Sequence, residues 1–313
     1  MSLKQVKLKI RAVKKTEQVT KAMEAVSAAK MRKAQEWALS ARPYAYSAFK
    51  ILKRIISQKE PIRHKLIEDR NGTEAKKALF IVLTSDRGLA GSLNSSILRL
   101  LANHLKENNY EKGNVSFITI GRKASEFVSR RNYLNLFSQK SFDDKTSLSE
   151  VIHIREIAEK TFRNGDFHKV YIVYTNFIST FEQRAIFHQL FPLKITEIES
   201  VLDGVRPTKG KYSNLFNKES SEKQTIYNYE PGVKSVLDSL LPFLAETIIF
   251  YAAIEFKASE HSARMVAMKS AGDKAKEVIK DLTRDYNKER QSIITREMSE
   301  IVGGIEALQV KNN

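Results

Sequence analysis

The most informative absence in this chain of 313 residues is cysteine, which does not occur at all. Disulfide bonds, thiol catalysis, cysteine zinc sites and thiol redox switches are therefore excluded by composition. The 6 histidines form no HxxxH or HExxH pair, the spacings that place two imidazoles on one helix face to bind a metal ion. We therefore expect neither a metal site nor a cofactor.

Long apolar runs and a secretion signal are also missing. The longest apolar candidate, residues 240–254, is interrupted by Pro242 and Glu246, whereas a membrane span needs roughly 20 apolar residues. The chain begins with a basic segment that has no apolar core followed by a small-residue cleavage site. The sequence predicts a protein that is soluble or at most bound to the surface of a membrane.

Acidic residues are scarce at one end of the chain. Residues 1–60 hold 15 Lys and Arg against 4 Asp and Glu, which contributes +11 to the total net charge of +17. Residues 230–313 are nearly neutral, with 12 basic and 13 acidic side chains. We therefore expect the N-terminal segment to bind an acidic partner.

Glycine is absent from residues 2–57, and proline occurs there once, at Pro43. Because the segment is rich in Ala, Lys, Met, Gln and Arg, it predicts a long helix over residues 1–57, with Pro43 as the place for a bend. Its apolar stripe begins at Leu3, shifts at Glu17 and resumes at Val19. This pattern predicts a coiled-coil seam with a stutter.

A second apolar stripe, with alternating spacings of three and four residues, runs through the last part of the chain. Its members are Tyr251, Ile254, Ala258, His261, Met265, Met268, Gly272, Ala275, Ile279, Leu282, Tyr286, Glu289, Ile293 and Arg296. This is the heptad spacing of a left-handed supercoil, and the two charged members predict that pairing weakens toward the end. At 1.5 Å per residue, a helix over residues 251–308 is about 87 Å long, so it needs a partner to cover its seam. The N-terminal helix, running antiparallel, is the obvious partner.

Between the two helical ends, residues 75–195 alternate apolar strand patterns with amphipathic helix patterns. This predicts an α/β domain inserted between the terminal helices, with a Rossmann-like parallel sheet covered on both faces and an added antiparallel strand at its end. The polar residues 196–230 are predicted to form a surface loop. Residues 231–313 are expected to complete the coiled coil, with Pro242 ending one helix and starting another.

The segment SDRGLAGSLN, residues 85–94, joins a predicted strand to a predicted helix and raises the question of nucleotide binding. It lacks the third glycine of GxGxxG, and no acid for a ribose follows the second strand, where the chain reads Gly121-Arg122-Lys123. The only Gly-Lys pair, at 210–211, precedes Tyr212 instead of Ser or Thr, so a P-loop is missing too. Neither phosphate-binding loop is present.

We interpret this segment as a strand-to-helix turn in which Asp86 or Ser92 satisfies backbone amides. Asp86 and Arg87 could alternatively contact a protein. Ser259, Glu260 and His261 are neighbours on one helix and point in different directions, so we do not expect a catalytic triad. The pair at residues 143–144 could bind a hard cation but is more typical of a solvated turn.

Three segments together resemble one family: residues 10–35 (IRAVKKTEQVTKAMEAVSAAKMRKAQ), residues 85–94, and residues 258–304. They are similar to the gamma subunits of F-type ATP synthases, in the same order and at the same spacing. The resemblance implies a rotary shaft without an active site, which couples ion flow through a membrane rotor to ATP synthesis and hydrolysis. It implies the alpha and beta subunits of the catalytic ring, the epsilon subunit and the membrane c-ring as partners. It also implies a peripheral location on the cytoplasmic face of a bacterial cell membrane.

The resemblance also implies which residues contact the alpha/beta ring. The positions that match the family's motifs are Met23, Arg264, Arg290, Gln291, Thr295 and Glu297. Further candidates on the basic helix and the turn are Lys30, Arg32, Lys33, Asp86 and Arg87. Plain seam packing is the alternative for Met23, and an exposed polar helix face is the alternative for Arg290 and Gln291.

Two other functions are compatible with parts of the sequence. A basic coiled coil with scattered Lys and Arg is also typical of a nucleic-acid-binding protein. An α/β domain also suits a nucleotide-dependent enzyme, although the missing glycines and acid weaken that reading.

Overall fold

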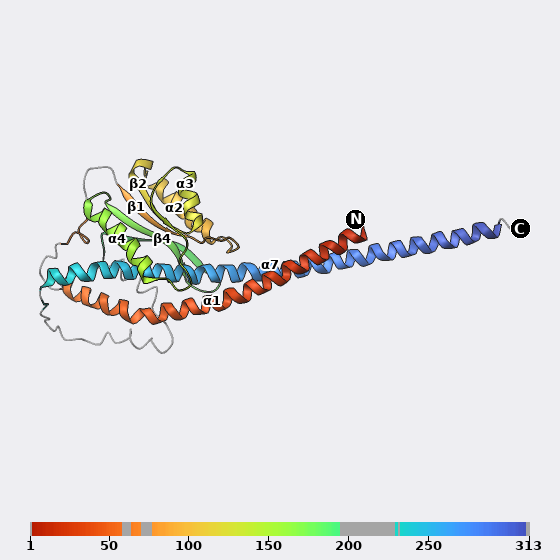
Figure 1. Cartoon of the computed structure of the whole chain (residues 1–313), viewed down its shortest axis with the longest axis horizontal. Helices are drawn as coiled ribbons and strands as arrows, with labels where there is room; N and C mark the ends of the chain where they lie inside the picture. Colours follow the sequence, from red (N-terminus) through yellow and green to blue (C-terminus); the bar gives the residue numbers. More distant parts are fainter. Residues whose placement is uncertain (1, 58–63, 70–76, 195–228, 231, 311–313) are drawn as a thin grey trace. The chain divides into compact units, whose positions relative to one another are not determined.

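The computed structural model describes residues 2–57, 64–69, 77–194, 229–230 and 232–310 (Figure 1). The chain divides into two compact units. The larger is residues 27–263, and the smaller combines residues 1–26 with residues 264–313. The surface loop predicted at 196–230 lies outside the described residues up to residue 228.

The larger unit contains a five-stranded sheet in the order β3-β2-β1-β4-β5. Its strands are β1 (Ala78–Leu83), β2 (Val115–Ile120), β3 (Leu134–Gln139), β4 (Lys169–Phe177) and β5 (Gln183–Phe191). The first four in the order are mutually parallel, and β5 pairs antiparallel with β4, as predicted. Every residue of β1 and β2 is buried, which requires cover on both faces of the sheet.

Helices α2 (Leu93–Glu107), α3 (Arg122–Arg130) and α4 (Leu148–Asn164) connect the parallel strands. A short 3₁₀ helix, η1 (Lys112–Asn114), precedes β2. The strand order reverses at β1, and right-handed crossovers on either side of such a reversal place their helices on opposite faces. Accordingly, α2 and α3 lie on one face of the sheet and α4 on the other (Figure 1).

Strand β3 was not predicted from the sequence. It is an edge strand that pairs only with β2, and its six residues alternate between exposed and half-buried positions. Leu134 at its start is 60% exposed. Its segment, LNLFSQ, lacks the continuous apolar run of the central strands because only a central strand is buried on both faces.

The two longest elements are α1 (Leu3–Ser57) and α7 (Val233–Val310). Helix α1 continues through Pro43, as the prediction of one long helix requires. Helix α7 continues through Pro242, so the prediction that Pro242 ends one helix and starts another is wrong. A proline inside a helix costs about 3 kcal/mol through the lost hydrogen bond and steric conflict. Burial of the neighbouring Leu241, Leu244 and Ala245 in the core offsets that cost.

Helix α7 contains an 18-residue window with a mean hydropathy of 1.6, which by length and composition is apolar enough to cross a membrane. However, 56% of that window is buried inside the fold. Ala245, Ile249, Ala252 and Phe256 are each at most 1% exposed and belong to the core of the larger unit. Packing in that core therefore accounts for the apolar composition of the window.

In the smaller unit, the first part of α1 pairs with the last part of α7. Gly272 of α7 is buried, and a Cβ atom added to it would lie 3.3 Å from Oγ1 of Thr20 on α1. Met268 and Ala275, which belong to the predicted C-terminal stripe, are also buried. Positions 289 and 296 of that stripe are exposed, in agreement with the predicted weakening of the pairing.

The predicted stutter in the N-terminal helix is wrong. The seam keeps its three-four spacing through Glu17, which is half-buried, to Thr20, which is 7% exposed. Val19 and Val26, assigned to the seam because they are apolar, are 58% and 55% exposed. A small side chain such as Thr20 allows the two helices to approach closely at Gly272. At this position the size of the side chain therefore matters more than its hydrophobicity.

Candidate functional site: the turn at the sheet edge and the terminal helices

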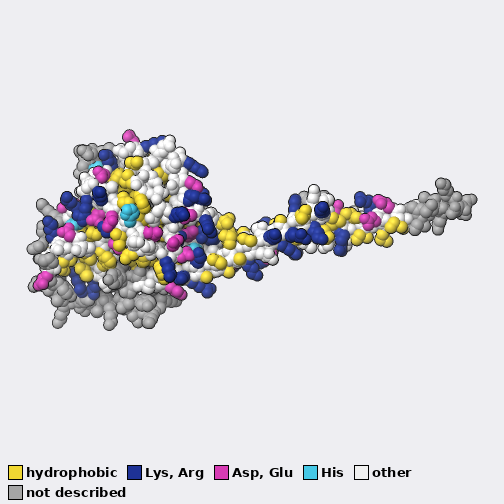
Figure 2. Space-filling model, in the orientation of Figure 1, with side chains coloured by type: hydrophobic (Ala, Val, Ile, Leu, Met, Phe, Trp, Pro, Cys, Tyr) yellow, Lys and Arg dark blue, Asp and Glu magenta, His cyan; other side chains and the backbone are white. Residues whose placement is uncertain are grey.

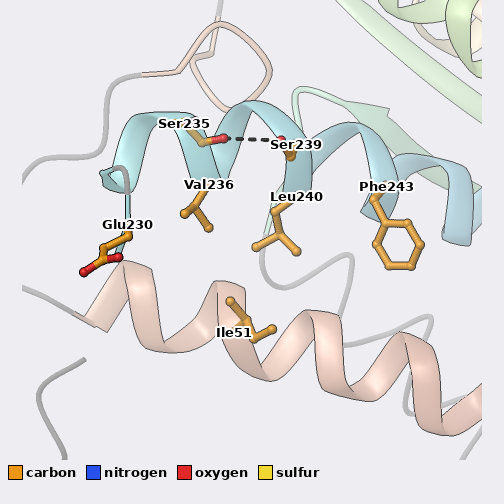
Figure 3. Close-up of a pocket in the computed structure, with 7 residues that line it drawn as sticks. All are labelled: Ile51, Glu230, Ser235, Val236, Ser239, Leu240 and Phe243. Carbon is orange, nitrogen blue, oxygen red and sulfur yellow. Dashed lines mark hydrogen bonds between the residues drawn. The ribbon is translucent and has the colours of Figure 1, made fainter. Parts of the chain in front are cut away.

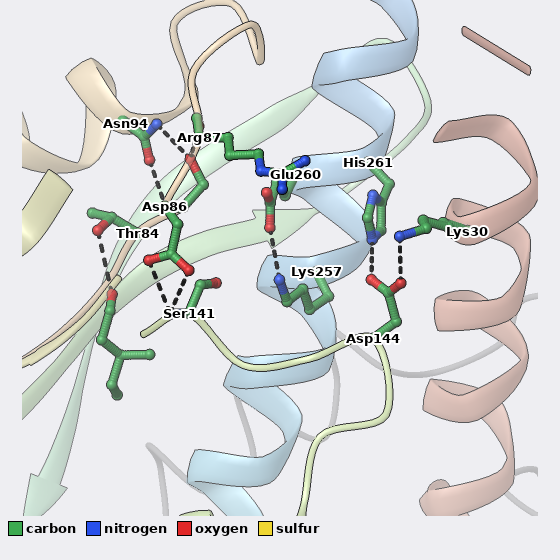
Figure 4. Close-up of polar contacts among 12 residues, drawn as sticks. Lys30, Thr84, Asp86, Arg87, Asn94, Ser141, Asp144, Lys257, Glu260 and His261 are labelled. Carbon is green, nitrogen blue, oxygen red and sulfur yellow. Dashed lines mark hydrogen bonds and ion pairs between the residues drawn. The ribbon is translucent and has the colours of Figure 1, made fainter. Parts of the chain in front are cut away.

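The turn after β1 is closed by its own side chains (Figure 4). The backbone N–H of Ser85 donates to Oδ1 of Asn94 at 3.0 Å, and Nδ2 of Asn94 donates to Oγ of Ser85 at 2.7 Å. Oγ of Ser85 in turn donates to the carbonyl oxygen of Arg87 at 2.6 Å. These bonds hold the two ends of the turn together.

Asp86 satisfies backbone amides, as the turn interpretation predicts. Its Oδ1 accepts from the N–H of Arg122, the first residue of α3, at 2.9 Å, and from the N–H of Ser141 at 3.1 Å. Ser92, the other predicted residue, makes no side-chain capping bond to α2. The Asp86 carboxylate thus occupies the N-terminus of α3, the part of a helix that attracts an anion.

Gly121 lies between β2 and α3. Glycine is required there because the backbone of Thr84, just after β1, lies where a Cβ atom would be. The φ of Gly121 is +94°, and a side chain would overlap the carbonyl oxygen of Thr84. Oγ1 of Thr84 accepts from the N–H of Ala124 at 2.8 Å, which satisfies another amide in the first turn of α3. This tight junction leaves only the outer part of the turn accessible.

The outward part of the turn consists of Arg87, Gly88 and Leu89, which are all exposed. Leu89 is 62% exposed and has a φ of +64°, a conformation that non-glycine residues rarely adopt. The turn therefore presents a guanidinium and an apolar side chain to solvent, a combination suited to contact with another macromolecule.

A cluster of charged groups joins three segments of the larger unit (Figure 4). Asp144 lies 2.7 Å from Nζ of Lys30 on α1 through Oδ2, and 2.7 Å from Nε2 of His261 on α7 through Oδ1. Asp144 therefore belongs neither to a cation site nor to a merely solvated turn. Among the described residues, no group of three His, Asp or Glu side chains could hold a metal ion.

The segment Ser259-Glu260-His261 does not form a nucleophile–base pair. Oγ of Ser259 donates to the carbonyl oxygen of Thr175 on β4 at 3.1 Å, and Glu260 pairs with Lys257 at 3.0 Å. Each of these polar side chains is thus committed to a structural contact. The reading of this segment as non-catalytic agrees with this geometry.

Burial and pairing shift the pKa values in the cluster. Burial lowers the pKa of His261, and this effect outweighs the opposing hydrogen bond to Asp144. Burial raises the pKa of Asp144, but the hydrogen bonds from Lys30 and His261 outweigh it and leave a net lowering. At neutral pH the cluster therefore contains an ionised Asp144.

The candidate contact residues of the terminal helices lie mostly on exposed faces. Those that are exposed are Arg32, Lys33, Arg290, Gln291, Thr295 and Glu297, whereas Met23 and Arg264 are half-buried. Lys30 is also exposed, and its ammonium group pairs with Asp144. Figure 2 shows Lys and Arg side chains along the paired helices, interspersed with hydrophobic ones.

The far end of α7 also exposes a group of large apolar side chains, Ile294, Met298, Ile301 and Val302, with exposed fractions between 47% and 63%. They accompany the polar candidates in the region where the seam loses its apolar members. Clustered exposed apolar residues of this kind are typical of a surface that another protein covers.

A shallow groove of about 400 Å³ lies between α1 and the beginning of α7 (Figure 3). Its lining is mainly apolar, with Ile51 on one side and Val236, Leu240 and Phe243 on the other. The hydroxyl of Ser239 bonds to the helix's own backbone at Ser235. The groove thus offers apolar contact but few polar groups that could orient a small ligand.

The Lys30–Asp144–His261 cluster was not predicted, because no local pattern in the sequence links its members. Asp144 and His261 are 117 positions apart, and neither lies in a recognisable motif for ion pairing. The polar candidates at the end of α7 were predicted from the family's motif, and the change in the heptad pattern there favoured partner contact over packing within the helix pair. The spacing of apolar residues shows where the buried face of a helix ends. It does not show which side chains far apart in the sequence come into contact.

Together, the fold and these surfaces define a class of protein: terminal helices that pair with each other, an α/β domain inserted between them, and contact surfaces on the helices and the sheet edge. Comparison with known proteins makes the assignment specific. A family profile described as "ATP synthase" matches residues 2–308. The chain belongs to the ATP synthase gamma-chain family.

Relatives match over nearly the whole length. The ATP synthase gamma chain of Heliobacterium modesticaldum is 38% identical over 312 residues, covering 98% of this chain and 99% of the relative. That of Stenotrophomonas maltophilia is 37% identical over 305 residues, covering 97% and 99%. These relatives favour the resemblance drawn from the sequence motifs over the nucleic-acid alternative.

Solved structures share the fold at low sequence identity. A chain in a cryo-EM structure of the Euglena gracilis mitochondrial ATP synthase, OSCP/F1/c-ring, superposes with a TM-score of 0.64 at 17% identity, covering 99% of this chain and 96% of that chain. A chain in the central stalk/c-ring structure from Tetrahymena thermophila gives a TM-score of 0.56 at 20% identity, covering 81% and 99%. The predicted fold class is confirmed.

Proposed function

We propose that this chain is the central-stalk shaft of an F-type ATP synthase, which couples ion flow through a membrane rotor to ATP synthesis and hydrolysis in an alpha/beta ring. The observation that carries the proposal is full-length membership of the gamma-chain family, with relatives 37–38% identical. Its partners are the alpha and beta subunits, the epsilon subunit and the membrane c-ring. Similar solved structures of an ATP synthase rotor and of a central stalk with its c-ring support this set.

To couple rotation to ATP synthesis or hydrolysis, the shaft must make different contacts with each conformation of the ring subunits. A ligand or partner shifts an equilibrium only by its differential affinity for the two states. The paired helices supply a surface that can make such contacts. Exposed Lys and Arg orient the shaft toward acidic partner surfaces, because exposed ion pairs guide association more than they strengthen it.

The shaft has no active site of its own. The turn after β1 is closed by Ser85 and Asn94, and the Asp86 carboxylate occupies the N-terminus of α3. These contacts support a structural role for the position at which related α/β folds bind a nucleotide. Catalysis belongs to the ring, and this chain needs no cofactor.

The residues proposed to contact the ring are Met23, Lys30, Arg32, Lys33, Asp86, Arg87, Arg264, Arg290, Gln291, Thr295 and Glu297. Exposed residues at the end of α7 and in the turn after β1 form two groups among them. Arg290, Gln291, Thr295 and Glu297, together with the apolar residues near them, face the ring from the end of α7. Arg87 and Leu89 face it from the turn after β1. Their exposure supports this assignment, since contacts that form and break during rotation must lie on accessible surfaces.

The location of the chain follows from its partners. It is a peripheral protein that reaches a bacterial membrane through the rotor to which it binds, on the cytoplasmic face. The burial of the apolar window of α7 in the core supports a peripheral attachment over insertion of that helix.

Reconstitution tests the proposal. Alpha/beta rings are assembled with membrane rotors in vesicles, with or without this chain, and ATP hydrolysis and proton pumping are measured. We expect pumping to require the chain, and we expect the purified chain alone to hydrolyse no ATP. Pumping that is unchanged without the chain would refute the shaft function.

A further inference from the structure

Asp144 binds both long helices at the same time. Its two carboxylate oxygens are used separately: one faces Nε2 of His261 on α7 and the other faces Nζ of Lys30 on α1, each at 2.7 Å (Figure 4). Asp144 itself lies in neither helix but in the connection between β3 and α4. A single carboxylate thus links α1, α7 and the α/β domain.

The connection that carries Asp144 is fixed to the α/β domain. Phe142 is 1% exposed within the core cluster, and Thr146 is 7% exposed. The N–H of Ser141 donates to the carboxylate of Asp86, which is also bound to the start of α3. Because residues on both sides of Asp144 are buried or hydrogen-bonded, the connection is held to the α/β domain.

Both helical partners lie at the limits of the larger unit. Lys30 is three residues after Ser27, with which α1 enters this unit, and His261 is two residues before Ala263, with which α7 leaves it. Asp144 therefore contacts each helix within one turn of the limit of the larger unit.

The polar surroundings favour one arrangement of this bridge. Nε2 of His261 faces a carboxylate oxygen, which only accepts, so Nε2 carries a proton and donates to Asp144. Nδ1 of His261 is buried and has no hydrogen-bond partner in the part of the chain that the structure describes. The adjacent Lys257 and Glu260 pair with each other at 3.0 Å. Among the described residues, Lys30 and His261 contact the Asp144 carboxylate directly.

We propose that Asp144 is a positioning residue that clamps α1 and α7 to the α/β domain, so that torque passes between the helices and the domain without slippage. This inference rests on the proposed shaft function. The residues of the clamp act by keeping the helices in register with the part of the chain that carries the sheet.

The first test compares two neighbouring carboxylates. Asp144→Asn removes the charge that binds Lys30, and Asp143→Asn makes the same chemical change at an exposed position one residue away. Both variants are reconstituted with the ring and the membrane rotor, and ATP hydrolysis and the maximal proton gradient are measured per assembled complex. We expect Asp144→Asn to lower the maximal gradient while hydrolysis without a gradient persists, because a weakened clamp slips only under load. The Asp143→Asn chain should match the unsubstituted chain.

An equal maximal gradient for Asp144→Asn and the unsubstituted chain would overturn the clamp and leave the shaft function intact. Failure of the unsubstituted chain to support pumping would instead overturn the shaft function. His261→Gln provides a second control, because its amide N–H can still donate to Asp144. We expect that variant to sustain a normal gradient.

A rescue experiment separates clamping from a general effect on folding. The chain has no cysteine, so Lys30→Cys with Asp144→Cys introduces a unique thiol pair that a bis-maleimide can bridge before reconstitution. The same purified double variant is compared with and without the bridge, which removes differences in folding yield. We expect the bridge to restore the maximal gradient that the unbridged variant lacks. Equal gradients with and without the bridge would overturn the proposal.

Discussion

The close approach of the two helices at Gly272 leads to a quantitative prediction about the paired helices. A Cβ atom at this position would lie 3.3 Å from Oγ1 of Thr20, which is tighter than an ordinary contact. Replacing glycine by alanine inside a helix stabilises it by about 1 kcal/mol. At Gly272 we expect the displacement of Thr20 to cancel much of that gain, so that Gly272→Ala leaves the stability nearly unchanged.

A larger side chain should force the helices apart. Overpacking of a well-packed contact costs about 1–3 kcal/mol, and we expect Gly272→Leu to lower the free energy of unfolding of the helix pair by that amount. Gly303 is the matched control, because it lies in the same helix with nothing within 4 Å of an added Cβ. Gly303→Leu should therefore not destabilise the chain.

The assay is urea unfolding of the full chain, followed by far-UV circular dichroism. The combination of Thr20→Ala with Gly272→Ala provides a double-mutant cycle, and removal of the threonine hydroxyl should release the helix-propensity gain of the alanine. If Gly272→Leu is as stable as the unsubstituted chain, or if the cycle shows no coupling between Thr20 and Gly272, the close helix contact is refuted.

Three further predictions concern other parts of the chain. Gln291→Ala with Thr295→Ala should lower coupled turnover but not assembly, since both residues are exposed; lost assembly with normal turnover per purified complex would make them structural. Burial lowers the pKa of His104, so the folded state resists its protonation, and stability should be full above about pH 6.5 and decline below it. His104→Phe should flatten this decline in urea titrations, and an unchanged pH profile would contradict the assignment. Gly121→Ala should cost at least about 3 kcal/mol in urea unfolding, through its positive φ and the overlap with the Thr84 carbonyl; a smaller loss would contradict this geometry.

The sequence by itself determined the overall organisation of this protein. Near-continuous apolar runs identified β1, β2 and β4, because strands buried on both faces carry mostly apolar side chains. The heptad spacing identified the C-terminal seam and the place where it weakens. The motifs at both ends identified the family, because each motif is a contiguous segment that can be recognised in the sequence without knowing the fold.

Other features depended on tertiary structure. The sequence placed Val19 in the seam, whereas the approach of Gly272 selected the smaller Thr20, because backbone proximity is decided by both helices together. Pro242 remained within α7 because core packing on neighbouring residues offset its local cost. Asp144 meets His261 across 117 positions only because the sheet brings the β3–α4 connection beside α7. Local patterns fix which face of an element is apolar, but distant contacts arise only when the whole chain has folded.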